Sequence, residues 1–171
     1  MKKFHNSLIF SKICPASRSS YLRDTKDFLS KLHALEKFPV DAIIASVDVV
    51  NLYPSTPHQD GLSALSKFLV QQGMPKPEVS DVYALAQFLL TGNYFTFDSD
   101  RFLQISGTAI GTRMAPTYAI IFMHILETQM LKEVPYRPFI WLRFIDDIFM
   151  VWCHGENKLI DFFAVSQHCS S

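Results

Sequence analysis

The segment "RFIDDIF", residues 143–149, places two adjacent carboxylates, Asp146 and Asp147, in the middle of an apolar stretch. A helix here would bury both carboxylates, because apolar side chains would occupy every side of it, and a buried charge without a counter-ion is very costly. Two strands folded back on each other instead put the aspartates at or beside a turn, where Asp is a favoured residue. The segment therefore predicts a β-hairpin over 141–152. Taken alone, this segment is explained equally well by a hairpin whose turn merely happens to contain two aspartates without any function.

A third carboxylate, Asp48, lies in a second apolar segment, "ASVDVVNLY". Asp is depleted from strands, and a buried one has to be paired or to coordinate an ion. Two interpretations stay open: Asp48 forms an ion pair with Arg143 or Arg113, or it shares a cation with the aspartate pair of the hairpin. A ligand set made only of carboxylates suits Mg²⁺ or Mn²⁺ better than zinc or copper. Clusters of this kind carry out two-metal phosphoryl transfer.

The composition is that of a folded domain without excess charge. The chain has 171 residues, of which 49% are hydrophobic, and 16 basic residues balance 16 acidic ones. This size allows one domain with a real core, and the neutral balance counts against a nucleic-acid binder without excluding a local basic groove. Three unevenly spaced cysteines indicate neither a disulfide framework nor a zinc site, and they fit a reducing, intracellular compartment, nuclear or cytoplasmic. The apolar segments 118–126 and 134–152 are too short or too charged to span a membrane.

Local patterns predict alternating helices and strands. We expect helices over 24–38, 55–73 and 77–92, a buried strand over 42–53, a hairpin over 93–105 and a helix that Pro116 opens. In the first segment, the apolar residues near helical spacing, which a helix would turn toward the core, are Leu22, Phe28, Leu29, Leu32 and Leu35. In the second helix, the residues expected to face the core are Leu62, Leu65, Phe68 and Leu69. Pro39 would end the first helix, and Gly92 would follow the end of the third. This order favours an α+β domain with helices on one face of a mainly antiparallel sheet.

A glycine loop, "GTAIGTRMAP" over 107–116, precedes the last predicted helix. Gly107 and Gly111 permit close approach of the backbone to a ligand. The free N–H groups of a helix opened by Pro116 could face a phosphate or a nucleotide. The loop matches neither the dinucleotide-binding nor the Walker pattern, and in isolation it also fits an ordinary turn before a helix.

Together, the three segments resemble the catalytic blocks of reverse transcriptases, in the same order. "SVDVVNLY" is similar to the first aspartate block, "GTAIGTRMAP" to the glycine–proline block and "FIDDIF" to the Asp-Asp hairpin block. The sequence is closer still to the reverse transcriptases of Penelope-like retroelements, in the segments "LYPSTPHQDG", "GTAIGTRMAP" and "RFIDDIF". The likeness runs from about Ser20 to Phe163, which is most of the chain.

The resemblance implies an RNA-directed DNA polymerase. Asp48, Asp146 and Asp147 would hold two Mg²⁺ ions, with Mn²⁺ as an alternative. These ions would bind the phosphates of the incoming dNTP and activate the 3′-hydroxyl of a primer on an RNA or DNA template.

The same resemblance implies nucleotide-binding roles for five further residues. Tyr53 matches the aromatic at the sugar pocket, although it could equally finish a core strand. Gly111 and Pro116 would shape the loop under the nucleotide and template base, and Gln104 and Arg113 would contact the template or the nucleotide.

The resemblance also implies a domain plan with departures from the family. Residues 1–40 would form partial fingers, 41–163 the palm with its antiparallel sheet, and 164–171 a tail unlike the family, with no thumb and no GIY-YIG endonuclease. Ile110 stands where many reverse transcriptases have Gln. This plan leaves two alternatives to an active polymerase: a catalytically inert, truncated remnant, and a nucleic-acid-binding module that uses the palm sheet.

Overall fold

The structure is a computed structural model in which residues 20–35 and 37–168 are described. These residues form two compact units. The sheet unit contains 20–52 and the chain from 122 onward, and the helical unit contains 53–121. Part of the expected fingers segment (residues 1–19) and the end of the expected tail (169–171) lie outside the described residues.

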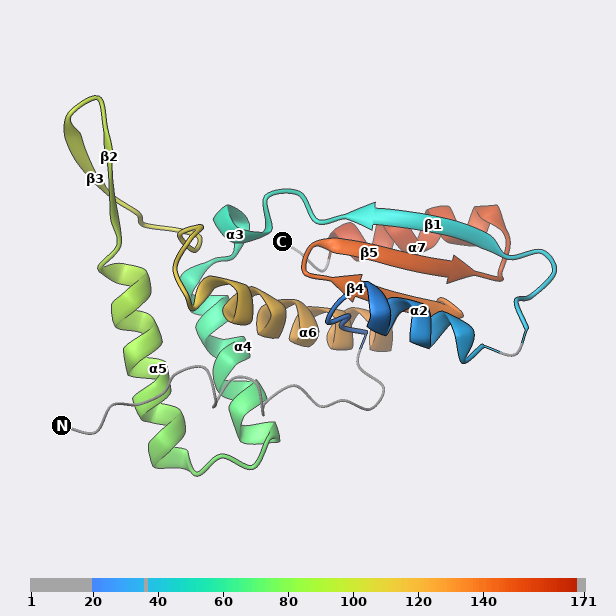
Figure 1. The fold of residues 1–171 in the computed structure, drawn as a ribbon, viewed down its shortest axis with the longest axis horizontal. Helices are drawn as coiled ribbons and strands as arrows, with labels where there is room; N and C mark the ends of the chain where they lie inside the picture. Colours follow the sequence, from blue (N-terminus) through green and yellow to red (C-terminus); the bar gives the residue numbers. More distant parts are fainter. Residues whose placement is uncertain (1–19, 36, 169–171) are drawn as a thin grey trace. The chain divides into compact units, whose positions relative to one another are not determined.

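The sheet unit is built on three antiparallel strands: β1 (Ile43–Asp48), β4 (Ile140–Phe144) and β5 (Asp147–Trp152). Their order is β1-β5-β4, so the second strand of the predicted hairpin is the central one (Figure 1). The register places Asp147 opposite Asp48 on one side and opposite Phe144 on the other. The hairpin predicted from "RFIDDIF" is therefore confirmed.

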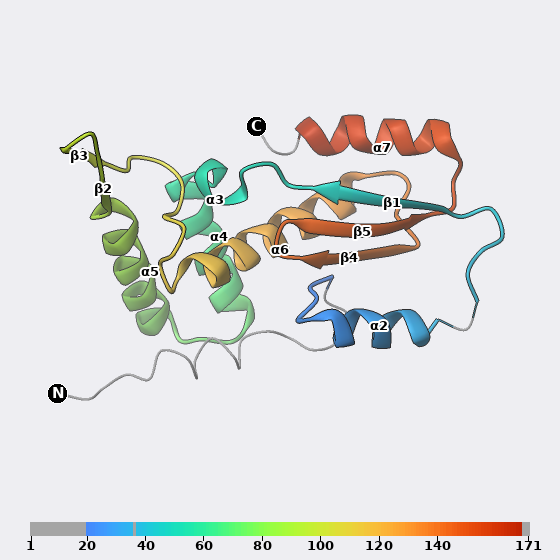
Figure 2. The ribbon, with the colours of Figure 1, turned by 45° about the horizontal axis from the view of Figure 1, so that its top comes forward.

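Helices cover both faces of this sheet. Figure 2 shows α7 (Glu156–His168) and α2 (Thr25–His33) on opposite sides of it. One face packs against α7 and the end of α6 (Ala115–Glu133) through Met130, Val134, Met150, Trp152 and Phe162. The other face packs Leu22, Ile140, Leu142 and Val151 against Phe28 of α2. The α+β class is confirmed, but the expectation of helices on one face only is wrong.

The helix α2 begins as expected and ends early. The carboxylate of its N-cap, Asp24, accepts a hydrogen bond of 2.8 Å from the backbone N–H of Asp27, which satisfies one of the free donors of the first turn. The N–H of Leu35 bonds to the carbonyl of Leu32 at 3.1 Å, and this tight last turn ends the helix before Pro39. Leu29, expected to face the core, is 46% exposed.

The strand expected over 42–53 is shorter and less buried than predicted. β1 lies at the edge of the sheet, its residues alternate between half-buried and exposed, and Ile44 is 64% exposed. Asn51 adopts a φ of 54°, and the chain then forms a short helix, α3 (Leu52–Ser55). Tyr53 therefore lies in a helical turn and does not finish a core strand.

The helical unit contains the next three predicted elements. α4 (His58–Gln71) and α5 (Lys76–Thr91) confirm two helices, and β2 (Tyr94–Phe97) pairs with β3 (Asp100–Leu103) as the predicted hairpin. Both turn residues of this hairpin have positive φ, 48° and 69°, as type I′ turns require. The four side chains of α4 expected in the core are buried: Leu62, Leu65, Phe68 and Leu69. No helix among the described residues is long and apolar enough to cross a membrane.

Candidate active site

The three aspartates of the predicted site meet at one end of the sheet unit. Asp48 is the last residue of β1 and Asp147 is the first residue of β5, and the two are direct cross-strand partners. Asp146 lies in the turn just before, and its carbonyl accepts a 3.1 Å hydrogen bond from the N–H of Val49. Residues almost a hundred positions apart thus become backbone neighbours.

The environment of Asp48 differs from the expected one. Asp48 and Asp147 are exposed and Asp146 is half-buried, so burial does not force any of them to find a counter-ion. Arg143 is bound to Glu127 instead, at 2.8 Å, which rules out the alternative in which it neutralises Asp48. Among the described residues, no ion pair involves any of the three aspartates.

The register itself raises an electrostatic question. Side chains directly opposite each other on an antiparallel pair have Cβ atoms roughly 4.5–5.5 Å apart, and like charges in this arrangement are destabilising. Asp48 and Asp147 occupy such a pair. A divalent cation between them would turn this repulsion into attraction.

The residue types at this site fit Mg²⁺ or Mn²⁺, because all the candidate donors are carboxylate oxygens. The side chains do not form a ready ligand cluster: within 20–35 and 37–168, no group of three or more His, Cys, Asp or Glu residues is placed to hold a metal ion. Mg²⁺ in phosphoryl-transfer enzymes typically binds through one or two carboxylates, with substrate phosphates and waters as the other ligands. The adjacent pair Asp48 and Asp147 is compatible with this mode.

The turn that carries Asp146 has an unusual backbone. Ile145 and Asp146 are the two residues between the paired positions Phe144 and Asp147, and Ile145 has a φ of +55°. A positive φ at the first of two turn residues is the mark of a type II′ turn, in which Gly normally takes this position. In a β-branched residue it is an outlier, and such strain concentrates at functional sites.

In the helical unit, the glycine loop is attached to α3 by its backbone. The N–H of Thr108 donates to the carbonyl of Tyr53 at 2.7 Å, and the ring Nε2 of His58 lies 2.7 Å from the carbonyl oxygen of Gly107. Gly107 has a φ of +74°, and a Cβ there would overlap the backbone of Pro54. Packing therefore requires a glycine at position 107. Gly111 has a φ of +103° but open space where a Cβ would lie.

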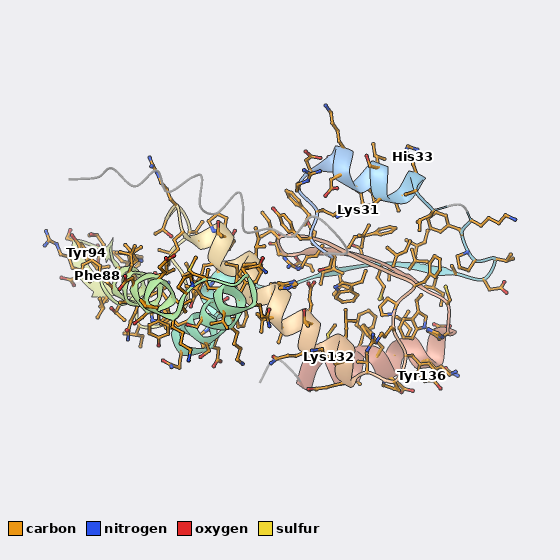
Figure 3. The ribbon with its side chains drawn as sticks, turned by 90° about the horizontal axis from the view of Figure 1, so that it is seen from below. Lys31, His33, Phe88, Tyr94, Lys132 and Tyr136 are labelled. Atoms are coloured by element: carbon orange, nitrogen blue, oxygen red, sulfur yellow. The ribbon has the colours of Figure 1, made fainter. Side chains whose placement is uncertain are left out.

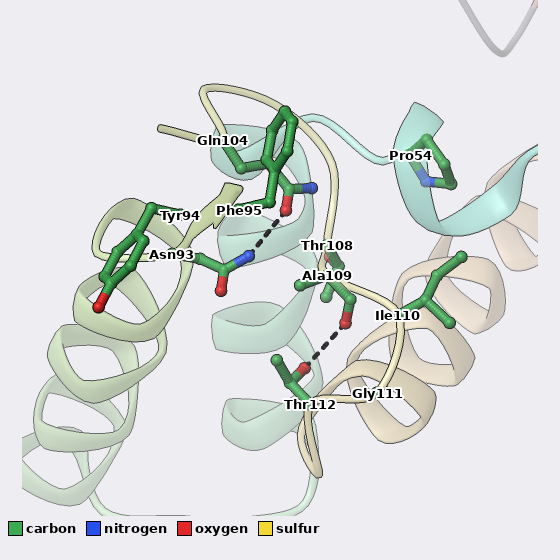
Figure 4. Close-up of a pocket in the computed structure, with 10 residues that line it drawn as sticks. All are labelled: Pro54, Asn93, Tyr94, Phe95, Gln104, Thr108, Ala109, Ile110, Gly111 and Thr112. Atoms are coloured by element: carbon green, nitrogen blue, oxygen red, sulfur yellow. Dashed lines mark hydrogen bonds between the residues drawn. The ribbon is translucent and has the colours of Figure 1, made fainter. Parts of the chain in front are cut away.

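This loop borders an open pocket of about 690 Å³ (Figure 4). Its lining residues are Pro54, Asn93, Tyr94, Phe95, Gln104, Thr108, Ala109, Ile110, Gly111 and Thr112. The side-chain amide of Asn93 donates to Oε1 of Gln104 at 2.8 Å, and that of Gln104 donates to the carbonyl of Ser106 at 3.0 Å. The Thr108 hydroxyl is buried without a hydrogen-bond partner among the described residues.

Of the five predicted nucleotide-binding residues, the structure places Gln104 and Gly111 at this pocket. Tyr53 is half-buried in α3, Arg113 is exposed in the loop and Pro116 is the second residue of α6. Sequence analysis missed Asn93 and Phe95, because nothing in the hairpin pattern distinguishes residues at its base. It also missed Glu127, although an acidic residue that directly follows the apolar segment 118–126 was a signal.

The comparisons with known proteins concern the fold. No protein-family model matches the sequence, and no curated protein matches it. The structure is similar to an apo telomerase from Candida tropicalis truncated from its C-terminal domain, with a TM-score of 0.67 and 10% identity over 93% of this chain and 35% of that chain. It is also similar to a telomerase from Candida albicans in complex with a TWJ fragment of telomeric RNA, with a TM-score of 0.66 and 11% identity over 92% of this chain and 31% of that chain.

Telomerase is a reverse-transcriptase-related enzyme, so the fold of this chain is reverse-transcriptase-like. The chain spans about a third of the length of these telomerases. At such low identity the likeness shows the fold alone.

Proposed function

We propose that this chain is the palm of an RNA-directed DNA polymerase from a Penelope-like retroelement. It would add dNTPs to the 3′-hydroxyl of a primer on an RNA or DNA template, in the nucleus or the cytoplasm. Two independent lines support this proposal: the three sequence blocks in reverse-transcriptase order, and the reverse-transcriptase-like fold.

The observation that carries the proposal is the register between β1 and β5. It puts Asp48 directly opposite Asp147, with Asp146 in the adjoining turn. A strand pair that only had to be stable would not place two like charges face to face at its end. The arrangement supports a site in which a cation, itself bound to a phosphate, neutralises the negative charge of the aspartates.

In the proposed mechanism, the carboxylates of Asp48, Asp146 and Asp147 would hold two Mg²⁺ ions or, alternatively, Mn²⁺. Bound there, the ions would supply activation of the primer hydroxyl and neutralisation of the charge that develops on the phosphates. The protein's own contribution is to position the carboxylates: the antiparallel pairing of β1 with β5 keeps Asp48 and Asp147 at a fixed separation.

Five residues would contact the nucleotide, as the resemblance to reverse transcriptases implies. We propose contacts from Gln104 and Gly111, which border the pocket, and from Tyr53, Arg113 and Pro116. Gly111 offers a backbone without a Cβ in open space, so a base or sugar could lie close to it. Arg113 is an exposed cation of the kind that pairs with phosphates.

Primer extension tests this function directly. The chain would be incubated with a primed RNA template, dNTPs and Mg²⁺, and the products separated by length. We expect extension that is lost in Asp146→Asn, which removes one ligand charge, and kept in Asp161→Asn, an exposed aspartate of α7. Extension that is equal in the two variants would contradict the role of Asp146. Absence of extension by the wild-type chain, while a longer homologue is active, would contradict the proposed function and favour an inert remnant.

A nucleic-acid-binding module is the second candidate, because of the hairpin β2–β3. Phe95 and Phe102 are stacked, with ring centroids 5.6 Å apart, and both are exposed, as are Tyr94 and Phe97. Figure 3 shows Tyr94 and the exposed Phe88 of α5 at the surface of their unit. Exposed aromatic rings stack on unpaired bases without sequence preference. Under this alternative, single-stranded RNA binding needs no Mg²⁺, survives Asp48→Ala and is lost in Phe95→Ala.

A further inference from the structure

A buried ion pair lies next to the aspartate turn in the sheet unit. Nε of Arg143 is 2.8 Å from Oε1 of Glu127, and their side chains are 0% and 4% exposed. Arg and Glu are almost never buried to this extent unless they are paired. If either partner were removed, the other would remain as an uncompensated buried charge.

The carboxylate of Glu127 accepts hydrogen bonds from three side chains. Oε1 accepts hydrogen bonds from Nε1 of Trp141 at 2.9 Å and from Nε of Arg143 at 2.8 Å. Oε2 accepts one from the hydroxyl of Ser20 at 2.7 Å. Two residues of the strand β4 and one residue before α2 thus hold this carboxylate of α6, and through it the guanidinium, in one position.

The guanidinium also reaches the turn. Nη1 of Arg143 donates a hydrogen bond of 2.8 Å to the carbonyl oxygen of Ile145. That carbonyl belongs to the peptide that leads into Asp146, and Ile145 has the strained φ of +55°. A planar guanidinium can donate in two directions at once, so a single side chain ties the turn to the fixed carboxylate of Glu127.

Stability alone does not explain why this position holds an arginine. Replacing a buried ion pair by apolar side chains of similar volume is often neutral or stabilising, because burial of two charges costs about as much as their attraction returns. An apolar pair, however, could not hold the carbonyl of Ile145. What the ion pair adds is a defined geometry at the turn.

We infer that Arg143 and Glu127 are positioning residues, which hold the Ile145–Asp146 peptide and so fix the turn that leads into Asp147, one of the two facing carboxylates proposed to bind a divalent cation. This inference rests on the proposed function and deepens it. It assigns the strained turn conformation to a hydrogen bond from a buried side chain rather than to the turn sequence.

The test uses the double variant E127M/R143M, because the single variants leave one buried charge unpaired and are expected to unfold. Two quantities are measured: hydrogen exchange of the amides of 145–147, and Mn²⁺ affinity by electron paramagnetic resonance. We expect a cooperative melting transition near that of the wild type, turn exchange faster by about tenfold or more, and Mn²⁺ affinity weaker by roughly 10- to 100-fold. A folded double variant with wild-type exchange and wild-type affinity would overturn the inference.

A second variant, R143K, decides the matter if the double variant does not fold. It keeps a positive charge beside Glu127 but replaces the planar guanidinium by a single ammonium group, which cannot donate to both Glu127 and the carbonyl of Ile145 in this geometry. We expect faster exchange at the turn with the melting temperature nearly kept, and unchanged turn exchange would overturn the inference here too. The matched control is R137M, an exposed arginine of the same unit, which should change neither quantity.

The two readouts separate this inference from the proposed function. If the wild-type chain binds no Mn²⁺ and extends no primer, the proposed function fails, and the exchange of the turn still shows whether Arg143 holds it. If the wild type binds Mn²⁺ and R143K leaves both the exchange and the affinity unchanged, the positioning role fails while the proposed function stands.

Discussion

At the scale of single residues, Gly61 of the helical unit packs closely against the side chain of Tyr118. A Cβ at this position would overlap the hydroxyl and ring of Tyr118. The Tyr118 hydroxyl donates to the carbonyl of His58 at 3.1 Å, and burial raises its pKa above the usual range, so it stays a neutral donor. The contact joins α4 to the start of α6 at a point where only glycine fits.

Gly61→Ala should therefore destabilise the helical unit. We expect a loss of roughly 1–3 kcal/mol, the usual range for overpacking a core, measured as a lower melting temperature by circular dichroism. Adding Tyr118→Phe should recover part of the loss, since the hydroxyl is the nearest overlapping atom. Ser63→Ala on the same helix serves as the control. A Gly61→Ala variant as stable as this control would contradict the close packing of Gly61 against Tyr118.

His124 gives the sheet unit a pH dependence. Burial lowers the pKa of this half-buried ring below its usual 6.5, with Glu127 opposing the shift and Arg143 adding to it. The ring therefore binds a proton more readily in the unfolded chain than in the folded one near and below pH 6.5. As a result, the free energy of unfolding is highest above this pH and falls as the pH is lowered. Unfolding in urea at several pH values should show this loss.

The loss should be smaller in His124→Gln, which cannot bind the proton, and unchanged in His33→Gln, whose ring is exposed at the end of α2. Equal pH dependence in His124→Gln and the wild type would show that this ring is not responsible.

At the scale of elements, the glycine loop separates two kinds of glycine. Gly107 and Gly111 both have positive φ, but only Gly107 packs against backbone, that of Pro54. Gly107→Ala should thus lower the melting temperature clearly more than Gly111→Ala, where left-handed backbone strain of about 1–2 kcal/mol acts alone. Circular dichroism checks the order of the two, and a milder effect at Gly107 would contradict the attachment of the loop to α3.

Elements with strong local signals were predictable from the sequence. Both hairpins and the helices α4 and α5 follow from apolar spacing and turn residues. β1 was predicted too long, because its Ile and Val residues indicate a buried strand, whereas its edge position leaves alternate residues exposed. The helix α7 was missed, because the charged residues in "GENKLIDFF" break up its apolar stripe and Phe162 becomes a core residue only by packing on the sheet.

At the scale of the whole molecule, the order of the sequence blocks predicted what local patterns could not. The approach of Asp48 to Asp147 depends on strand order and register, which a single sequence reveals only through its resemblance to a family. Arg143 shows the limit of this reasoning: its charge was noticed, but its partner Glu127 lies sixteen residues earlier on a separate helix. Only the packing of α6 on the sheet brings the two together.

The measurement that tests the central claim most directly is a Mn²⁺ titration followed by electron paramagnetic resonance. It would compare the wild-type chain with Asp48→Asn, Asp147→Asn and the control Asp41→Asn, an exposed aspartate just before β1. We expect one or two bound ions in the wild type and in the control, and binding weaker by at least about tenfold in each of the other two variants. Equal binding in all four proteins, or none in the wild type, would contradict a cation site built by the pairing of β1 with β5.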